Sequence, residues 1–478
     1  MWAGARKSAI SGAEYYRCGA VRDRIREYCG LGNAAASCRF LAVQTGRSVR
    51  ESSWEETPFC PPCSLDRILS DGSDVSRSVW DEGGFLFFID VDYQNPDRPA
   101  EPFVHPIETF FKLEPAYRAV RDTLHDFGLN PLNLLTGEGY HFTGHIPKGH
   151  PIRRRLEDLA PAAPPWLASQ RARLPAWSTY QMDESTARAY VGYGLVLEHL
   201  AHAILRRAAA TSEVPVVLQG TVVGAGPNGR ECISLDLSHV AYPLDVRHVR
   251  AAFSAYQKHI IRPDIYGHPV AGGIPACAMV LRNGTSLLGA LEASRDLQKA
   301  ASLAGQCSAA LPDLAEGVTR LLDSYLGSTL RRSHVAFYST PADPAGAAAD
   351  LRQLRRDGPP PCISSCLDQP NDLLLRPEYI QLLTRFLLSR GWAPRRIAGA
   401  IQALYEGDHG WGERWVRMDP EWRADVYVRS FAGAIDDGLD QAIDFNCVST
   451  REKGMCTGGM CGHNLADDRA ALLAGKAS

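Results

Sequence analysis

Residues 83–93 read GGFLFFIDVDY, a short apolar run that follows two glycines and ends in two aspartates. Its length and its aromatic and β-branched residues predict a buried strand. Side chains alternate along a strand, so Asp90 and Asp92 share one face, with their Cα atoms roughly 6.5–7 Å apart. Burying two like charges is costly unless a cation compensates them, and hard oxygen ligands at this spacing suit Mg²⁺ or Mn²⁺. A strand end with two solvated aspartates would show the same pattern.

The segments around this strand alternate between helical and strand patterns. The expected elements are a helix over 106–127, a strand, glycine turn and strand over 133–146, a long helix over 183–209 and a strand over 231–238. This order predicts an α/β domain over residues 81–340. Residues 1–80 are rich in serine, arginine and cysteine, and we expect this segment to pack on that domain.

The composition changes after residue 340. Residues 341–361 are dense in proline, glycine and alanine, which is typical of a linker. Beyond them, LLLRPEYIQLLTRFLLSRGW (373–392) is the clearest amphipathic helical segment. We therefore expect a linker followed by a mostly α-helical, cysteine-bearing domain over residues 362–478.

The whole chain of 478 residues is long enough for two or three domains. Its net charge of -3 counts against a protein that coats nucleic acid through bulk charge, but its 51 lysines and arginines leave room for a local basic groove. No apolar run approaches the roughly 18 residues of a membrane span, and the N-terminus lacks the apolar core of a signal peptide. We therefore expect a cytoplasmic protein, in which the 13 cysteines bind metal or pack in the core.

A glycine turn, TGEGYH (136–141), follows the aspartate pair along the chain. Gly137 and Gly139 let the backbone approach a ligand closely, and His141 can donate a hydrogen bond to a phosphate oxygen. A glycine hairpin with a packed histidine would have the same sequence.

A third acid and a basic segment come next. Asp236 lies inside the apolar run of 231–238 and could complete a metal site from a neighbouring strand; a strand-end turn is the alternative. Arg247, Arg250 and Lys258 follow it, and their charges suit a triphosphate or a template backbone. They could equally form the solvated face of an amphipathic helix.

The order and spacing of these motifs resemble the catalytic core of the archaeo-eukaryotic primase superfamily, over roughly residues 80–260. The family's first motif, hDhD, is matched by IDVD (89–92), its second, an SGxGxH-like turn, by TGEGYH, and its third, an apolar residue plus an acid, by LD (235–236). VRAAFSAYQK (249–258) resembles the family's IRxPxSLHxKxG segment, with Tyr256 where histidine is usual. The serine of the second motif is replaced by Thr136 or Gly139, depending on the alignment of the turn.

This resemblance implies a primase-polymerase catalytic domain with an RRM-like sheet. It implies that a 3′-hydroxyl attacks the α-phosphate of a nucleoside triphosphate, helped by metal ions and by charge. The residues that would hold Mg²⁺ or Mn²⁺ are Asp90, Asp92 and Asp236. Those that would bind the nucleotide are Gly137, Gly139, His141, Arg247, Arg250 and Lys258.

Four cysteines lie at the two ends of the C-terminal segment: Cys362, within a PPC sequence, and Cys447, Cys456 and Cys461. Four thiolates could hold a [4Fe–4S] cluster or a zinc ion, and Cys366 could substitute for the first. The arrangement resembles the C-terminal domain of the primase large subunit; unrelated packing cysteines are the alternative. Nearby cations and aromatics suit a groove for template and initiating nucleotide, or are ordinary surface residues: Arg385, Arg390, Arg395, Arg396, Trp411, Arg414, Trp415, Arg417 and Tyr427.

Cys60 and Cys63 form a CxxC pair near the N-terminus. They could bind zinc with two of three upstream thiols: Cys18, Cys29 and Cys38. The primase small subunit often carries a zinc-binding insertion, although it usually follows the first motif. A redox role is less expected, because no thioredoxin-like βαβ pattern surrounds the pair.

These expectations together describe a DNA-dependent primase-polymerase, a nucleotidyltransferase that makes primers on single-stranded DNA from nucleoside triphosphates. Such a fusion of catalytic and iron–sulfur domains suits a mobile element, phage or accessory system, with a replicative helicase as a further partner. One alternative is a gap-filling or repair polymerase of the same superfamily that does not prime. Another is a non-catalytic nucleic-acid-binding protein that uses the cysteine domain.

Overall fold

The structure is a computed structural model of the chain. It describes residues 10–31, 38–44, 59–82, 84–160, 162–168, 182–241, 248–256, 258–267, 275–281, 286–341, 343–407, 419–456, 459 and 461–475. Mixed α and β content dominates the N-terminal and central parts, and the C-terminal region is helical, as expected. Among the described helices, none has the length and hydropathy needed to cross a lipid bilayer.

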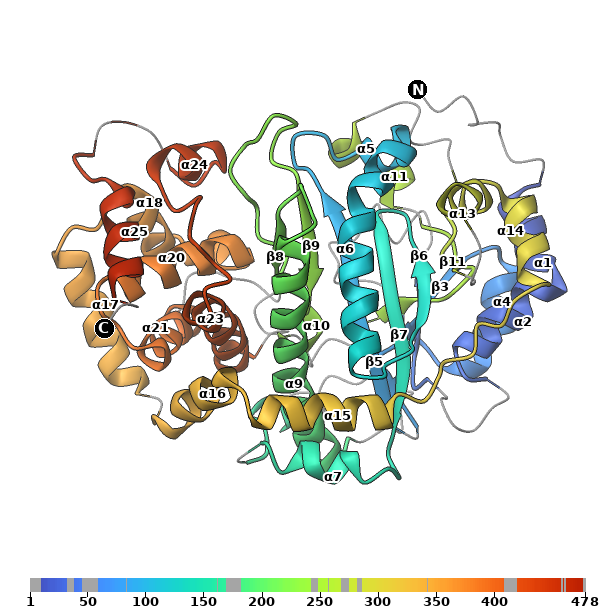
Figure 1. Ribbon diagram of the computed structural model, residues 1–478, viewed down its shortest axis with the longest axis horizontal. Coiled ribbons are helices and arrows are strands. Elements are labelled where there is room, and N and C mark those ends of the chain that lie inside the picture. Colours follow the sequence, from blue (N-terminus) through green and yellow to red (C-terminus); the bar gives the residue numbers. More distant parts are fainter. Residues whose placement is uncertain are drawn as a thin grey trace.

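A mixed, mainly antiparallel sheet forms the centre of the molecule (Figure 1). Its strand order is β11-β6-β7-β5-β9-β8, and β4 pairs with the beginning of β5. The strand bounds are β4 Trp80–Asp81, β5 Gly84–Gln94, β6 Leu132–Leu135, β7 Gly139–Pro147, β8 Val216–Leu218, β9 Cys232–Asp236 and β11 Met279–Val280. The predicted strand GGFLFFIDVDY is therefore the central strand β5, paired on both sides.

The connections between these strands follow a β-α-β-β-α-β order. Helix α6 (Pro106–Asp126) joins β5 to β6, a tight turn joins β6 to β7, and α9 (Glu184–Ala209) lies between β7 and β9. The four strands lie in the order β9-β5-β7-β6, and each neighbouring pair is antiparallel. This connectivity places the first and third strands at the centre of the sheet, as in ferredoxin-like folds.

Helices α6 and α9 cover one face of this sheet, and they stand side by side in front of it in Figure 1. The odd-numbered residues of β5 point to these helices: the rings of Phe85 and Phe87 contact Tyr193 of α9 at centroid distances of 5.4 and 6.2 Å. On β7, Tyr140 contacts Phe110 of α6 at 5.6 Å. The even-numbered residues of β5 therefore point to the opposite face, where Asp90 and Asp92 lie.

The N-terminal segment forms a second, smaller sheet with strand order β10-β3-β1-β2, and its helices lie on the right of Figure 1. Its strand β10 comes from the middle of the chain and pairs with β3, with Arg250 opposite Ser76. The elements of this part are α1 Gly12–Arg17, α2 Gly19–Tyr28, β1 Leu41–Gln44, β2 Phe59–Cys60, a 3₁₀ turn Pro62–Ser64, α4 Leu65–Ser70, β3 Asp74–Ser78, β10 His248–Arg250, α13 Leu287–Ser294 and α14 Leu297–Ala304. Residues of both sheets share one apolar cluster, so the N-terminal segment packs on the central sheet.

The region expected to be a linker contains a helix. Helix α17 (Pro344–Arg356) is packed against α21, with Ala347, Leu351 and Leu354 buried. The expectation of an irregular linker over 341–361 was wrong for these residues, because three apolar side chains at helical spacing outweigh the proline and glycine at the ends of the segment. Asp343 caps the helix, where its side chain accepts a hydrogen bond from the backbone of Gly346.

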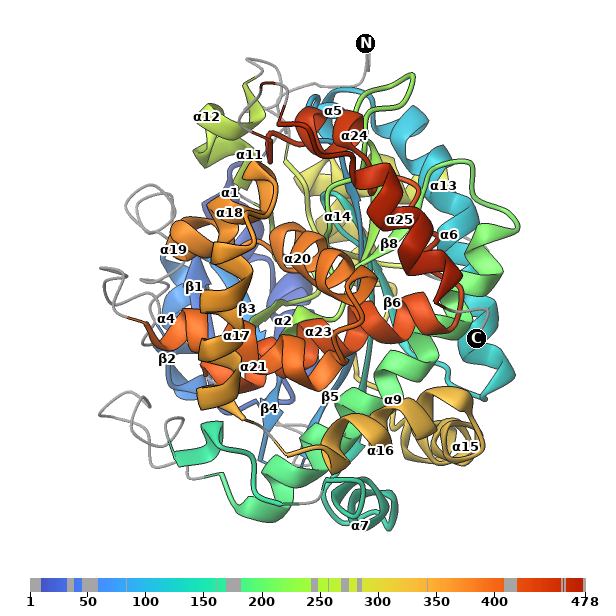
Figure 2. The ribbon, with the colours of Figure 1, turned by 90° about the vertical axis from the view of Figure 1, so that its left-hand side faces the viewer.

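The C-terminal region is a layer of helices beside the β8–β9 edge of the sheet (Figure 2). Its helices are α18 Pro361–Asp368, α19 Pro370–Leu373, α20 Pro377–Ser389, α21 Pro394–Glu406, α23 Pro420–Asp436, α24 Cys447–Glu452 and α25 Leu465–Ala474. Helices α15 (Ala315–Leu326) and α16 (Thr329–Ser339) lead into it. The remaining short helices are α5 Glu101–Val104, α7 Ile152–Glu157, α10 Ser238–Ala241, α11 Lys258–Ile261 and α12 Pro263–Tyr266.

Buried polar contacts join this helical layer to the elements of the central sheet. Glu198 of α9 lies between His334 of α16, at 3.1 Å, and Arg429 of α23, at 3.0 Å. The indole of Trp422 donates a hydrogen bond to the carbonyl of Val240. One continuous apolar cluster runs from the sheet through α9 to α20 and α23, so the two regions share a core.

Candidate active site

The register of three antiparallel strands brings the predicted acids and the histidine together. Asp90 of β5 lies directly opposite His141 of β7 on one side and opposite Asp236 of β9 on the other. Cross-strand partners project to the same face of a sheet, so these three side chains form a row. Asp92 lies two residues further along β5 on the same face. The strand pattern alone could not provide this alignment, because a shift of one residue would turn Asp236 to the opposite face.

Within the row, Asp90 and His141 are in contact. His141 Nε2 lies 3.3 Å from Asp90 Oδ1, and His141 is 9% exposed. Neither Asp90 Oδ1 nor His141 Nδ1 has a hydrogen-bond partner in the part of the chain that the structure describes, although both atoms are buried. Buried polar atoms of this kind are expensive unless a ligand or water satisfies them. A carboxylate and an imidazole therefore remain available for a ligand on this face.

The electrostatics of Asp92 show how densely the acids are placed. Burial raises the pKa of this carboxyl well above its usual range, and the nearby carboxylates of Asp90 and Glu138 raise it further. The ammonium of Lys258 lowers the pKa of Asp92, and the carboxylate of Asp236 raises it by a smaller amount. A divalent cation would relieve this repulsion, and Mg²⁺ and Mn²⁺ prefer oxygen ligands of this kind. As placed in the described residues, however, these acids do not form a group of three or more side chains that could hold a metal ion.

The third acid has a second contact that fixes its position. Asp236 Oδ1 accepts a hydrogen bond of 2.7 Å from the backbone N–H of Ser238, where α10 begins. This bond holds the carboxylate at the end of β9. The alternative of a strand-end turn and the metal-site interpretation are therefore compatible at this residue.

The glycine turn approaches its neighbours closely at two places. A Cβ atom on Gly139 would lie 1.8 Å from the carbonyl oxygen of Val91, so only glycine allows β7 to pair with β5 there. A Cβ on Gly137 would lie 3.0 Å from the ring of Tyr256. Thr136 Oγ1 accepts a hydrogen bond from the Gly139 N–H and closes the turn.

The basic segment reaches the same site, as far as it is described. The guanidinium of Arg250 lies 5.0 Å from the centroid of the Tyr256 ring, and the ammonium of Lys258 lies 5.6 Å from it. Arg250 Nη1 also donates a hydrogen bond to the carbonyl of Ala255. Arg247 lies outside the described residues. Lys258 therefore lies near enough to the acids to lower the pKa of Asp92, whereas Arg250 contacts Tyr256 and Ala255.

Three further residues belong to the site and were missed from the sequence. Glu138 accepts hydrogen bonds from the hydroxyls of Tyr256, at 2.5 Å, and Tyr266, at 2.6 Å. Arg295 Nη2 donates to the carbonyl of Gly137 from behind the turn, at 3.2 Å, and burial lowers its pKa to about 10. The only signal for this group was the tyrosine in place of histidine at 256; nothing in the sequence linked Tyr266 or Arg295 to the turn.

The four C-terminal cysteines gather around Cys362. Burial raises the pKa of this thiol to about 12, and the neighbouring Cys456, Cys447 and Cys461 add to the shift. Cys447 and Cys461 both lie near the carbonyl of His463, with Sγ–O distances of 3.8 and 3.9 Å. Cys366 is fully buried one helical turn after Cys362 and donates to its carbonyl.

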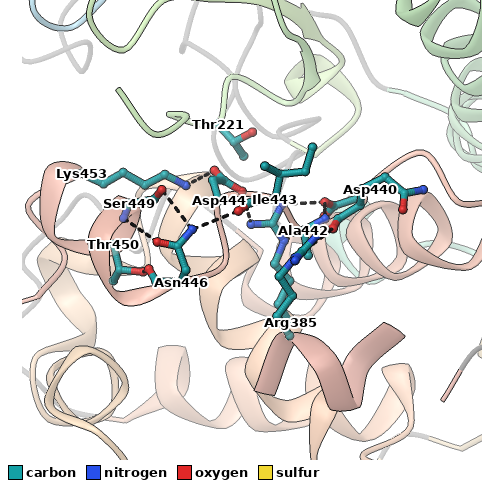
Figure 3. Close-up of polar contacts among 12 residues, drawn as sticks. Thr221, Arg385, Asp440, Ala442, Ile443, Asp444, Asn446, Ser449, Thr450 and Lys453 are labelled. Carbon is teal, nitrogen blue, oxygen red and sulfur yellow. Dashed lines mark hydrogen bonds and ion pairs between the residues drawn. The ribbon is translucent and has the colours of Figure 1, made fainter. Parts of the chain in front are cut away.

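Ion pairs fix the segment that carries Cys447. Arg385 of α20 pairs with Asp440 at 2.7 Å and with Asp444 at 2.9 Å, and Lys453 pairs with Asp444 (Figure 3). Helix α24 then contacts the β8–β9 connection: Glu452 accepts a hydrogen bond of 3.0 Å from the Ala225 N–H. The cysteine region is thus attached to the strand that carries Asp236.

The N-terminal cysteines are arranged differently from the predicted zinc site. Cys29 and Cys38 are buried together, and a hydrogen bond between the thiols is the main cause that lowers the pKa of Cys38. Cys60 is partly buried and Cys63 is exposed. Across the described residues as a whole, no group of three or more His, Cys, Asp or Glu side chains has the geometry to hold a metal ion.

A cavity of about 410 Å³ adjoins the cysteine region. Some of the predicted groove residues line this cavity and others do not. Arg390, Trp392 and Arg396 line it, with the Arg396 guanidinium 4.1 Å from the Trp392 ring centroid. Arg390 and Arg396 also form ion pairs, with Asp468 and Asp350. Arg385 and Arg395 form buried ion pairs and do not line the cavity. Tyr427 is also buried, and the remaining groove residues, in 411–417, lie outside the described residues.

Comparisons with known protein families, with curated proteins and with solved structures find no match for this chain.

Proposed function

We propose that this chain is a template-dependent nucleotidyltransferase, a primase-polymerase that makes primers on single-stranded DNA. The observation that supports it most is the alignment of Asp90 with His141 and Asp236 across three strands, with Asp92 on the same face. The motif order had predicted these residues as one site before any pairing was known.

The topology of the sheet agrees with this proposal. The β-α-β-β-α-β order, with helices on one face and the acids on the other, is what an RRM-like catalytic sheet requires. The acids lie on β5 and β9, at the centre of the sheet, where backbone pairing on both sides limits their movement. A rigid base of this kind suits a reaction that depends on positioning.

Each side of the site has a separate task in the proposed reaction. Asp90, Asp92 and Asp236 would hold Mg²⁺ or Mn²⁺, which supply Lewis-acid stabilisation of the charge on the transferred phosphoryl group. His141 would donate a hydrogen bond to a phosphate oxygen, and Arg250 with Lys258 would neutralise the triphosphate. The attacking group is the 3′-hydroxyl of the growing strand, and pyrophosphate leaves.

The C-terminal region would hold the template and the initiating nucleotide. The cavity beside the cysteines offers Trp392 for stacking and two partly exposed arginines, Arg390 and Arg396, for phosphate. Cys362, Cys447, Cys456 and Cys461 would hold a [4Fe–4S] cluster or zinc, a proposal supported by the effect of the other three thiols on the pKa of Cys362. The contact of α24 with the β8–β9 connection would keep this region next to the catalytic face.

A primer-synthesis assay tests the proposal. The protein is incubated with unprimed single-stranded DNA, Mn²⁺ and either NTPs or dNTPs, and labelled products are separated by length. We expect products from the wild type and none from Asp90→Ala/Asp92→Ala, with unchanged melting temperature and DNA binding. Asp122→Asn, an exposed carboxylate on α6, is the matched control and should retain activity.

The other outcomes decide between the alternatives. Extension of a supplied primer without synthesis on unprimed DNA would identify a gap-filling or repair polymerase. DNA binding without synthesis on any template would reject the enzyme and leave a nucleic-acid-binding protein.

A further inference from the structure

Tyr256 lies at the point where the acidic and basic halves of the candidate active site meet. It is 8% exposed, in the loop between β10 and α11. Its hydroxyl donates a hydrogen bond of 2.5 Å to the Glu138 carboxylate. The guanidinium of Arg250 and the ammonium of Lys258 lie over its ring, 5.0 and 5.6 Å from the ring centroid. One side chain therefore contacts an acid through its hydroxyl and two cations through its ring.

The surroundings fix this ring in place. Phe103 lies nearly parallel to it at a centroid distance of 5.8 Å, and so does His259 at 5.8 Å. Gly137 lies close against the ring, since a Cβ there would come within 3.0 Å of two ring carbons. Such packing leaves the ring little freedom to rotate away from its partners.

Glu138 is held by two donors from different elements. Tyr266 of α12 donates to Glu138 Oε1 at 2.6 Å, while Tyr256 donates to Oε2. Both oxygens of the carboxylate are thus directed by phenols. The charge of Glu138 is felt at Asp92, whose pKa it helps to raise.

We propose that Tyr256 is a positioning residue with two separable tasks, an inference that rests on the proposed function. Its hydroxyl fixes Glu138 next to Asp92, where the added negative charge strengthens the binding of divalent cations. Its ring holds Arg250 and Lys258 in place for a nucleoside triphosphate.

The chemistry of a phenol suits both tasks. Burial and the Glu138 carboxylate hold the pKa of Tyr256 far above its usual value, so the hydroxyl stays protonated and donates at any working pH. The face of an aromatic ring attracts cations without neutralising them, so Arg250 and Lys258 keep their full charge for phosphate.

Substitutions can separate the two tasks. Tyr256→Phe keeps the ring and removes the hydroxyl, Tyr256→Leu removes both, and Tyr266→Phe removes the second donor to Glu138. Binding of Mn²⁺ to the protein alone is followed by electron paramagnetic resonance. Binding of ATP with saturating Ca²⁺, which avoids turnover, is followed by calorimetry. Tyr405→Phe, which removes a buried hydroxyl in α21 that donates to Leu374, is the matched control.

We expect Tyr256→Phe and Tyr266→Phe each to weaken Mn²⁺ binding by about three- to tenfold, the loss of one hydrogen bond to a charged group. ATP binding should change less than about twofold in both. Tyr256→Leu should also weaken ATP binding, by about tenfold, because two cation–π contacts are lost. Equal effects of Tyr256→Phe and Tyr256→Leu on both ligands would overturn the inference.

A double-mutant cycle tests whether the hydroxyl acts through Glu138. In a Glu138→Gln background, Tyr256→Phe should have no further effect on Mn²⁺ binding, because the charge that it positions is gone. An additive effect would overturn the inference, and this cycle decides it even if Tyr256→Leu does not fold.

These binding measurements are independent of synthesis. If the wild type makes no primers but the cycle is non-additive, the role of Tyr256 holds and the proposed polymerase reaction fails. If the wild type makes primers and the cycle is additive, the reaction holds and this role of Tyr256 fails.

Discussion

At the scale of single residues, the two glycines of the turn have neighbours of different kinds. The atom that a side chain on Gly139 would strike is a backbone oxygen of β5, which cannot move without breaking strand pairing. The atoms near Gly137 belong to the ring of Tyr256. The same substitution at the two positions therefore has different consequences.

We predict that Gly139→Ala destabilises the protein by about 3 kcal/mol or more, because β7 must separate from β5. Gly137→Ala should cost about 1–2 kcal/mol, because a ring can shift where a backbone cannot. Urea denaturation of both variants measures the difference. Equal losses of unfolding free energy in the two variants would contradict the close approach of Gly139 to the backbone of Val91.

Residue-level prediction from the sequence worked where a motif fixed the spacing. Asp90, Asp92, His141 and Asp236 were named in advance, and the structure places them in one row. Glu138 was inside a quoted motif but had no assigned role, because its partner Tyr266 lies more than a hundred residues away. Contacts of that kind depend on how loops close, and no local pattern encodes them.

At the scale of elements, α9 connects the central sheet to the helical region, and it carries a partly buried titratable group, His199. Burial lowers the pKa of His199 to about 4, and the nearby His202 and Arg206 lower it further. In the unfolded chain this histidine takes up a proton near pH 6.5. The contribution of His199 to the free energy of unfolding is therefore fully present above about pH 6.5, and it is lost as the pH falls towards 4.

We predict that His199→Asn reduces the loss of stability between pH 7.5 and pH 5 by about 1 kcal/mol, a value that allows for solvent screening at this partly exposed site. Thermal melts at several pH values measure it. Ser324→Ala, which removes the hydrogen-bond partner of His199 but leaves the titrating ring, should keep the wild-type pH dependence. If the melting temperature of His199→Asn differs from that of the wild type by the same amount at every pH, the titration of His199 is not the cause of the pH dependence.

Helix α17 is the element for which composition misled the prediction. Alanine favours helix strongly, and only Pro344 at the first helical position and Gly346 lie inside its bounds. Pro341 lies before its start, and Gly358 and the prolines at 359–361 lie beyond its end, so averaging over the whole segment concealed the helix. The long apolar patterns of β5, α6 and α9 were predicted within a residue or two, because burial of a full face sets them.

We predict that Leu351→Ala lowers the free energy of unfolding by about 2–4 kcal/mol, since a buried side chain leaves a cavity between α17 and α21. Arg352→Ala, at the exposed neighbouring position, should change it by less than about 0.5 kcal/mol. Chemical denaturation measures both. A flexible linker would show no difference between them.

At the scale of the whole molecule, the four C-terminal cysteines of the proposed metal site come from three parts of the C-terminal region. Cys362 begins α18, Cys447 begins α24, and Cys456 and Cys461 precede α25. A metal centre at these thiols would cross-link helices that are separate in sequence, in the manner of a structural zinc or iron–sulfur site.

We predict that the protein purified without oxygen is brown and contains about four iron atoms per chain, as a [4Fe–4S] cluster requires. Cys362→Ser should lose most of the metal and lower the melting temperature, because the cross-link is lost. Cys366→Ser, one turn away, is the control and should keep both. Elemental analysis measures the metal; a colourless protein with stoichiometric zinc would exclude the cluster but retain the site.

The pairing of β10 with β3 has a consequence for the order in which the chain is made. The ribosome synthesises residues 74–78 of β3 long before residues 248–250 of β10. At ~5–20 residues per second, roughly ten seconds or longer pass before the partner strand of β3 has been made. During that interval β3 presents an open edge, which attracts other strands. Nascent chains that stop before residue 248 should therefore depend on chaperones, whereas chains released after β10 can close the smaller sheet on their own.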